Sequence, residues 1–286
     1  IAEGLNYGLG FMVIFMLHFT VATKQPAMTA ARFAEAVEKT PQGKTVNMKL
    51  AQLLVDVFRS QSIAVLGNVL IAMGLAALIA FGYQYKTGEP LMNADQIAYQ
   101  LHSIDPFAGT LWFAAIAGVW LFCSGIISGY FDNRSNYLNM RMRLTQHPLL
   151  KKLMSEKSRV KFANYMHENY GSLIGNLCFG MLLGITGVVG YLTHLPLDIR
   201  HVAFSSANVG YIAVSGQFTY SLLLQCIGFV LLIGLVNLIV SFSLTLWVAL
   251  RSLNAEIESW WPIWYEVCQI VKKRPLSLFF PVQLDK

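Results

Sequence analysis

Long apolar runs alternate with charged connecting segments along the chain. A helix of about 20 apolar residues can span the hydrocarbon core of a bilayer, and it satisfies its backbone polar groups internally, as lipid requires. The pattern therefore predicts an all-α integral membrane protein, with residues 1–286 forming a single helical membrane domain. The five predicted transmembrane helices are the runs without Asp, Glu, Lys or Arg: 4–22, 63–83, 107–130, 172–192 and 221–250.

The connecting segments differ strongly in their content of Lys and Arg. The counts are six in 23–62, one in 84–106, eight in 131–171, one in 193–220 and five in 251–286. Cytoplasmic loops carry an excess of Lys and Arg, so the alternation predicts an external N-terminus and a cytoplasmic C-terminus. We expect a multi-pass protein of the bacterial inner (cytoplasmic) membrane. Because the chain opens with Ile1 and no basic leader, we also expect it to be a fragment of a longer chain.

Composition excludes a soluble globular domain and narrows the expected partners. Hydrophobic residues make up 55% of the chain and charged residues 13%, whereas about 25% of residues are charged in an average soluble domain. The net charge of +6 indicates cytoplasmic loops beside anionic lipid headgroups. The four cysteines form no C-x-x-C pair, so we expect free thiols and neither a metal nor a cofactor.

Two segments after predicted spans carry small residues at helical spacing. Pro26 suits the first turn of a helix over 24–37, and Asp198 can cap a helix over 198–212. Smooth faces of this kind allow helices to approach closely. The small residues are Ala27, Ala30, Ala31 and Ala34 in the first segment and Ala203, Ser206, Ala207 and Gly210 in the second.

The two segments follow spans that run in opposite directions through the membrane. This arrangement suggests an inverted repeat, which is common in transporters, although the halves show no convincing sequence identity. Whether the segments re-enter the bilayer or lie at its interface stays open. In a transporter or channel, polar residues beside the two breaks would line opposite ends of a path. These candidates are His18, Thr23, Lys24 and Gln25 inside and Asp198, Arg200, His201 and Asn208 outside.

The stretch from Val46 to Gln61 is amphipathic, with Leu and Val on one stripe and charged residues elsewhere. We expect this stretch to lie along the inner membrane surface before the chain turns into the second span. Polar residues within the spans are expected to form hydrogen bonds between helices. They are Asn6, Asn68, Asn176, Gln225 and Asn237.

The loop over 131–171 is the most basic part of the chain. Its cations are interleaved with apolar and aromatic residues, a pattern that fits either an interfacial helix on anionic headgroups or nucleic-acid binding. The neighbouring membrane spans favour lipid and argue against nucleic acid. The candidate contacts are Arg141, Arg143, Lys151, Lys152, Arg159 and Lys161.

Glycines spaced four apart indicate helix faces that pack closely. The pairs are Gly125 with Gly129, Gly171 with Gly175 and Gly180 with Gly184. Such faces can join helices within one chain or form a homo-oligomer. Beyond the last span, Trp260, Trp261, Trp264 and Tyr265 form an aromatic cluster typical of the headgroup level.

Three stretches carry a family resemblance: "LNYGLGF", "HFTVATKQPAMTAARFAEAV" and "PLDIRHVAFSSANVGY". They resemble a bacterial multi-span membrane family named site-specific recombinase, the gonococcal recombinase-like group, in its C-terminal membrane part. The resemblance implies a membrane architecture and, by the family name, DNA recombination.

The residues themselves provide none of the known recombination chemistries. None of the six histidines is followed by Arg in the H-x-x-R spacing that tyrosine recombinases need, and the fifteen acidic residues form no obvious cluster of three. No zinc, nucleophile-elbow or phosphate-loop motif is present. We therefore expect a membrane scaffold, or an anchor for an upstream part. The alternatives are a transporter or channel and, second, a DNA recombinase.

Overall fold

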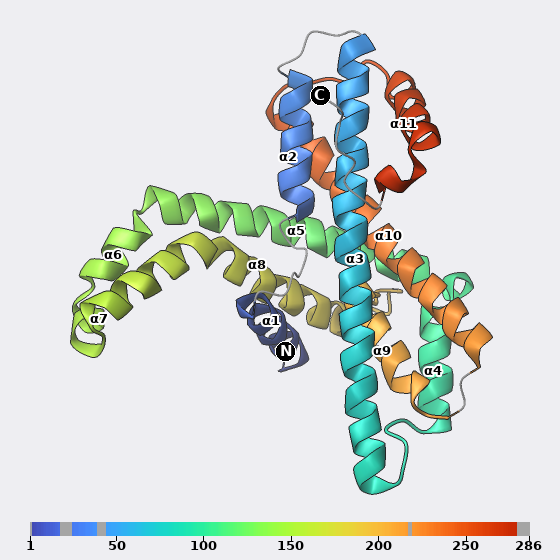
Figure 1. The fold of residues 1–286 in the computed structure, drawn as a ribbon. Coiled ribbons are helices and arrows are strands. Elements are labelled where there is room, and N and C mark those ends of the chain that lie inside the picture. Colours follow the sequence, from blue (N-terminus) through green and yellow to red (C-terminus); the bar gives the residue numbers. More distant parts are fainter. Residues whose placement is uncertain (1, 18–24, 39–43, 217–218, 279–286) are drawn as a thin grey trace. The chain divides into compact units, whose positions relative to one another are not determined.

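The computed structural model describes residues 2–17, 25–38, 44–216 and 219–278, and Figure 1 shows their arrangement. The described part is helical and contains no strand, which confirms the predicted all-α class. The elements are α1 (Ala2–Met16), α2 (Gln25–Glu38), α3 (Lys44–Thr87), α4 (Ala94–Ile104), η1 (Pro106–Ala108), α5 (Thr110–Tyr137), α6 (Met140–Gln146), α7 (Pro148–Leu153), α8 (Glu156–Thr193), α9 (Val202–Ala213), α10 (Tyr220–Ser252), α11 (Trp261–Lys273) and η2 (Pro275–Leu278).

Four of the described helices, α3, α5, α8 and α10, are long and apolar enough to cross a membrane. They contain three of the five predicted spans, and α5 covers the fourth, 107–130, from Thr110 onward. The helix at the first predicted span, α1, is apolar but has 15 residues, about 22 Å at 1.5 Å per residue. Residues 18–24, which include the end of that run, lie outside the described residues. A fifth span and the orientation in the membrane remain predictions.

The predicted turn between a surface helix and the second span is wrong. Helix α3 runs without interruption for 44 residues, because no Gly or Pro separates the amphipathic stretch from the apolar run. The apolar stripe of that stretch packs on protein instead of headgroups. Leu50 and Ala51 are buried in one cluster with residues of α2, α10 and α11.

The chain divides into two compact units. Unit 1 comprises residues 1–27 and 120–198, and unit 2 comprises residues 28–119 and 199–286. Helix α5 therefore begins in unit 2 and ends in unit 1. Each unit contains residues from both the first and the second half of the chain.

In unit 1, α1 and α8 cross where both helices carry glycines. Gly4 approaches the backbone of Gly184, and Gly8 approaches the backbone of Gly180. A Cβ atom on Gly180 would collide with the backbone of Gly8, which cannot move aside as a flexible side chain can. The predicted contact face at Gly180 and Gly184 is confirmed, and the paired order shows that the two helices run antiparallel.

The second half of α5 lies beside α8, and α6 and α7 join them into a long hairpin (Figure 1). Gly171 packs on Asp132 and Ser128 of α5, and its N–H donates to the Asp132 carboxylate at 3.0 Å. The Gly171 and Gly175 face is thus confirmed. Gly129 is different, because a Cβ atom there would meet no described atom within 4 Å. Gly125 is buried and Gly129 has no packing partner among the described residues, so the predicted contact face at Gly125 and Gly129 stays a prediction.

Unit 2 has two hydrophobic clusters that use matching elements. The first cluster joins α2, α3, α10 and α11, and the second joins α9, α10, α3 and α4 with the start of α5. The helices of the two sets correspond in pairs: α2 to α9, α3 to α10 and α11 to α4. The start of α5 belongs to the second set alone. The buried members are Ala30, Phe33, Ala34, Leu50, Ala51, Leu246 and Ile263 in the first cluster, and Val69, Ile104, Ala114, Val202, Val209, Cys226, Val230 and Ile233 in the second.

Helix α9 lies along the apolar part of α3. Gly210 approaches the backbone of Met73, while Val202 and Val65 both lie against the same face of Gly234 in α10. The predicted small-residue stripe therefore forms a contact. The predicted cap at Asp198 is wrong, because α9 begins after His201, and no side chain caps its first turn.

The matching clusters reflect an internal repeat. Gly180 and Gly184 follow Gly4 and Gly8 by 176 positions each, and α10 begins 176 positions after α3. The elements α1, α2, α3, α4 and η1 recur in the same order as α8, α9, α10, α11 and η2. Since α1 runs antiparallel to its equivalent helix α8, the second set is inverted relative to the first.

Candidate functional site

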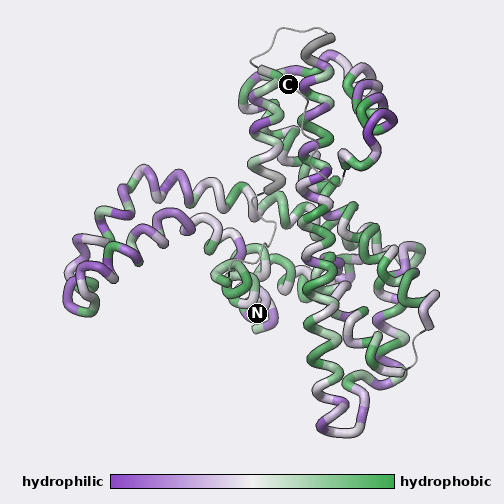
Figure 2. Tube along the Cα trace, viewed as in Figure 1, coloured by the Kyte–Doolittle hydropathy of each residue, from purple (hydrophilic) through white to green (hydrophobic). Residues whose placement is uncertain are grey.

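The six predicted basic contacts lie together at the end of the hairpin in unit 1. Figure 2 shows hydrophilic residues concentrated there, in contrast to the apolar middle of α3. Five of the six side chains are exposed, and Arg159 is partly buried. Arg141 and Arg143 lie on α6, Lys151 and Lys152 on α7, and Arg159 and Lys161 on the first turns of α8.

Large apolar side chains are exposed among these cations. Met142 on α6 is 62% exposed, and Leu149 and Leu153 on α7 are 61% and 79% exposed. Cations next to exposed apolar side chains are typical of segments that lie at a membrane interface, where apolar groups enter the acyl boundary and charges meet the headgroups. The end of the hairpin combines both properties.

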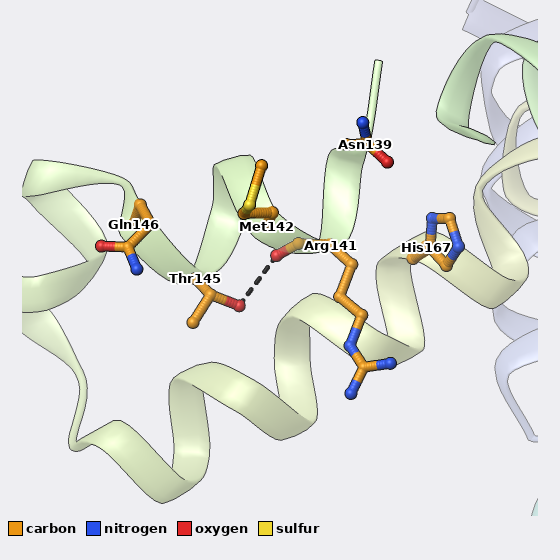
Figure 3. Close-up of a pocket in the computed structure, with 6 residues that line it drawn as sticks. All are labelled: Asn139, Arg141, Met142, Thr145, Gln146 and His167. Atoms are coloured by element: carbon orange, nitrogen blue, oxygen red, sulfur yellow. Dashed lines mark hydrogen bonds between the residues drawn. The ribbon is translucent and has the colours of Figure 1, made fainter. Parts of the chain in front are cut away.

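A polar pocket of about 360 Å³ lies between α6 and α8 (Figure 3). Arg141 extends from α6, and His167 comes from α8. The Thr145 hydroxyl donates to the backbone carbonyl oxygen of Arg141 at 2.8 Å, and the Arg141 side chain is exposed. No residue that the structure describes pairs with its guanidinium. The remaining lining residues are Asn139, Met142 and Gln146.

Buried contacts fix the base of this pocket. The Ser135 hydroxyl of α5 is fully buried and lies 3.0 Å from Nδ1 of His167. About one turn further along α8, the Gly171 N–H donates to the Asp132 carboxylate of α5. These contacts hold α5 against α8 and set the direction of the His167 ring. An anion with oxygen acceptors fits the pocket, because Arg141 supplies several N–H donors.

Three candidates of the second predicted group lie together in unit 2. Arg200 donates from Nε to the Ser103 carbonyl oxygen at 2.8 Å, and its guanidinium lies 5.4 Å from the centre of the Phe113 ring. The Asn237 amide donates to the carbonyl oxygens of Ala114 at 2.7 Å and Arg200 at 3.0 Å. These contacts tie α10 to α5 and to the segment before α9, as predicted for Asn237.

His201 and Asn208 belong to the same unit. His201 is 4% exposed, and burial lowers its pKa to about 4, so the imidazole is neutral at pH 7. The Asn208 amide donates to Oε1 of Gln100 at 2.7 Å. The Arg200 and Asn208 side chains thus tie α9 and the segment before it to α4 and α5.

Of the remaining predicted candidates, the structure describes the side chain of Asp198 alone. Asp198 belongs to unit 1. His18, Thr23 and Lys24 lie outside the described residues, and Gln25 opens α2 with a side chain that is also outside them. The predicted pairing of an inner and an outer set is therefore left as a prediction.

Sequence reasoning missed Gln61, which it placed at the end of a surface helix. Gln61 precedes Asn237 by 176 positions, and both carboxamides are 2% exposed. The Gln61 Nε2 atom has no hydrogen-bond acceptor among the described residues. The constant spacing between the two halves is the signal that could have identified it.

Within the described ranges, no three His, Cys, Asp or Glu side chains come close enough to hold a metal ion. The four cysteines are free thiols. The chemistry that these regions offer is therefore anion binding at the hairpin and backbone hydrogen bonding around Asn237.

Four helices are long and apolar enough to cross a membrane, and the described helices pack through small residues and buried amides, as the helices of membrane proteins do. The model of one family, described as site-specific recombinase, matches residues 1–281. The chain belongs to this family, which confirms the resemblance. No curated protein and no solved structure is similar to the chain.

Proposed function

We propose that this protein is a multi-pass scaffold of the bacterial inner membrane and that the hairpin of unit 1 binds anionic lipid headgroups. The observation that carries the proposal is the grouping of six cations with exposed Met142, Leu149 and Leu153 at the hairpin end. Each Lys or Arg near an anionic surface contributes about 1 kcal/mol. Six of them together bind strongly even when the individual contributions are only partly additive.

The proposal can be tested on the full chain in lipid nanodiscs. We expect hydrogen exchange over 138–161 to be slower in phosphatidylglycerol than in phosphatidylcholine, because the anionic surface orders the hairpin. Replacing all six cations by Gln should abolish the difference, and added salt should reduce it. The control replaces Lys272 and Lys273 of α11, which are exposed but lie in unit 2. Equal exchange in both lipids would contradict the proposal.

DNA recombination, the activity in the family name, is tested with the same protein. Phosphate contacts are strongest at low salt, so a DNA-binding hairpin would bind duplex DNA there and lose affinity steeply as salt rises. The six-Gln variant would remove this binding. We expect no DNA binding at low salt, and salt-dependent binding that needs the six cations would favour the recombinase alternative instead.

Transport is a second candidate because of one observation, the inverted repeat. In many transporters, two inverted repeats build a polar site near the middle of the membrane. Gln61 and Asn237 are buried polar side chains at equivalent positions of the two repeats. A cysteine at position 61, in a chain whose four native cysteines are replaced, separates the alternatives. Labelling by membrane-impermeant thiol reagents from both sides would favour transport, and no labelling from either side would favour the scaffold.

A further inference from the structure

A second cavity, of about 690 Å³, lies in unit 2 between α3, α10 and the start of α11. Its volume falls within the range of roughly 300–1,000 Å³ that small-molecule sites occupy. We call it the tryptophan groove. It is lined by Leu54, Val57, Phe58, Leu235, Leu238, Ile239, Phe242, Ser243, Leu246, Trp247, Leu250, Trp260 and Trp264.

The groove is long, almost entirely apolar and open along one side. Ser243 is the one lining residue that is neither aliphatic nor aromatic. Along α10 the lining extends from Leu235 to Leu250, about 22 Å at 1.5 Å per residue. This length exceeds half of the hydrocarbon core, about 15 Å, and so can hold an acyl chain of one leaflet. Ile239 and Trp247 are 53% and 61% exposed, which leaves the side of the groove accessible from the bilayer.

Aromatic side chains and a cation gather at one end of the groove. Trp247, Trp260 and Trp264 line this end, and tryptophan is the residue that prefers the headgroup level. The guanidinium of Arg251 lies 5.9 Å from the centre of the Trp247 ring. Arg251 is exposed, and in the described part of the chain no carboxylate pairs with it. A phosphate group at this position would meet a cation with several N–H donors.

Packing against buried side chains holds the tryptophan end of the groove in one conformation. The Trp260 ring stacks on Phe33 of α2, with centroids 6.1 Å apart and planes 7° apart. Phe33 and Ile263 of α11 are both 1% exposed in the first cluster. The groove is therefore a preformed feature of unit 2, shaped by the packing of α2, α3, α10 and α11.

We propose that the tryptophan groove binds one glycerophospholipid, with an acyl chain along α10 and the phosphate at Arg251. The apolar length of the groove matches an acyl chain, the tryptophans at one end match the interfacial glycerol region, and the cation beside them matches the phosphate of such a lipid. This site lies in unit 2 and is independent of the proposed headgroup contacts of the hairpin in unit 1.

The test is native mass spectrometry of the full chain in detergent with added phosphatidylglycerol. We expect one lipid to remain bound after detergent removal in the gas phase. Ile239→Trp should reduce the bound fraction about tenfold, because it fills the groove from a half-exposed position. Ile63→Trp is the matched control, since Ile63 is 51% exposed, does not line the groove and occupies the equivalent position of the other repeat. Thermal unfolding in detergent verifies that both variants fold.

Arg251→Gln tests the headgroup end. We expect it to weaken phosphatidylglycerol binding about tenfold and to leave binding of diacylglycerol, which lacks phosphate, unchanged. Equal lipid retention by the Ile239 and Ile63 variants would overturn the proposal, because it would show general annular contact. Absence of any retained lipid would also overturn the proposal and assign the groove to detergent. A change in oligomeric state with Ile239→Trp alone would overturn it and assign the groove to a second copy of the chain.

Discussion

The end of the hairpin in unit 1 and the polar cluster around Asn237 in unit 2 both concentrate polar side chains, yet they use them differently. At the hairpin, the guanidinium of Arg141 borders a pocket and has no partner in the described residues. In the cluster, the Arg200 guanidinium donates to carbonyl oxygens of Ser103 and Ile199. One chain thus contains an arginine that is available to bind a ligand and another that stabilises the fold.

The difference follows from burial. Inside a membrane protein, backbone groups that leave a helix need partners, and Arg200 and Asn237 supply them for the segment before α9. At the exposed hairpin end, water already satisfies the charged groups, so their pairing within the chain contributes little. Substitutions in the cluster should therefore change stability, and substitutions at the hairpin should change binding.

The largest effect is expected from Gly180→Val, in the packed part of unit 1 beneath the hairpin. The new side chain would collide with the backbone of Gly8, and we expect a loss of more than about 3 kcal/mol, measured as thermal unfolding in detergent. Gly187→Val on the same helix is the control, because its Cβ atom would meet no described atom within 4 Å. Equal unfolding temperatures of the two variants would show that α1 does not pack on α8.

A pH effect of similar size is expected from His201 in the polar cluster. Its folded-state pKa, about 4, lies below the unfolded value of 6.5, so the unfolded chain binds the proton first as pH falls. Stability should therefore decrease between pH 6.5 and 4, by about 3 kcal/mol in total. His201→Asn should remove this part of the pH dependence. The exposed His102→Asn should leave it in place, and a wild-type slope in the His201 variant would contradict the assignment.

Asn237→Leu should cost about 1–3 kcal/mol, because it leaves buried backbone groups of Ala114, Arg200 and Val202 without their partner. Gln61→Leu is the repeat-matched comparison. Since Nε2 of Gln61 has no acceptor in the described structure, its replacement should cost less than that of Asn237. Thermal unfolding of both variants in one detergent measures the difference, and a greater loss at Gln61 would reverse our assignment of the two amides.

The smallest effect on stability is expected at the hairpin. Arg141→Gln should change the free energy of unfolding by less than about 0.5 kcal/mol, because the guanidinium is exposed. The same substitution should weaken the response to phosphatidylglycerol in hydrogen exchange. A large loss of stability would place Arg141 with the structural arginines and remove the contrast between the two regions.

Sequence patterns predicted the helical class, four of the five spans, the start of α2 near Pro26 and the role of Asn237 between helices. They could not predict the continuity of α3. An apolar stripe at helical spacing looks the same whether it faces headgroups or, like Leu50 and Ala51, the side chains of α2 and α11. Glycine spacing likewise indicates a smooth face without identifying its partner. Gly180 packs on the backbone of α1, whereas Gly129 meets no described atom within 4 Å.

The sequence suggested an inverted repeat but not which residues correspond, because the two halves conserve size and position more than identity. Gln61 corresponds to Asn237, and the buried Leu50 corresponds to Cys226. Once the helices that contain them are matched, the constant spacing of 176 positions identifies such pairs. The candidate site was predictable at the hairpin, where charge alone marks it, and not at the tryptophan groove, which needs three helices to form.

The reciprocal glycine contact between α1 and α8 has the geometry of a symmetric interface. Each helix offers the other the same two-glycine surface, with Gly4 against Gly184 and Gly8 against Gly180. The contact is therefore self-complementary, as the interface of a two-fold dimer is, although both surfaces here belong to one chain.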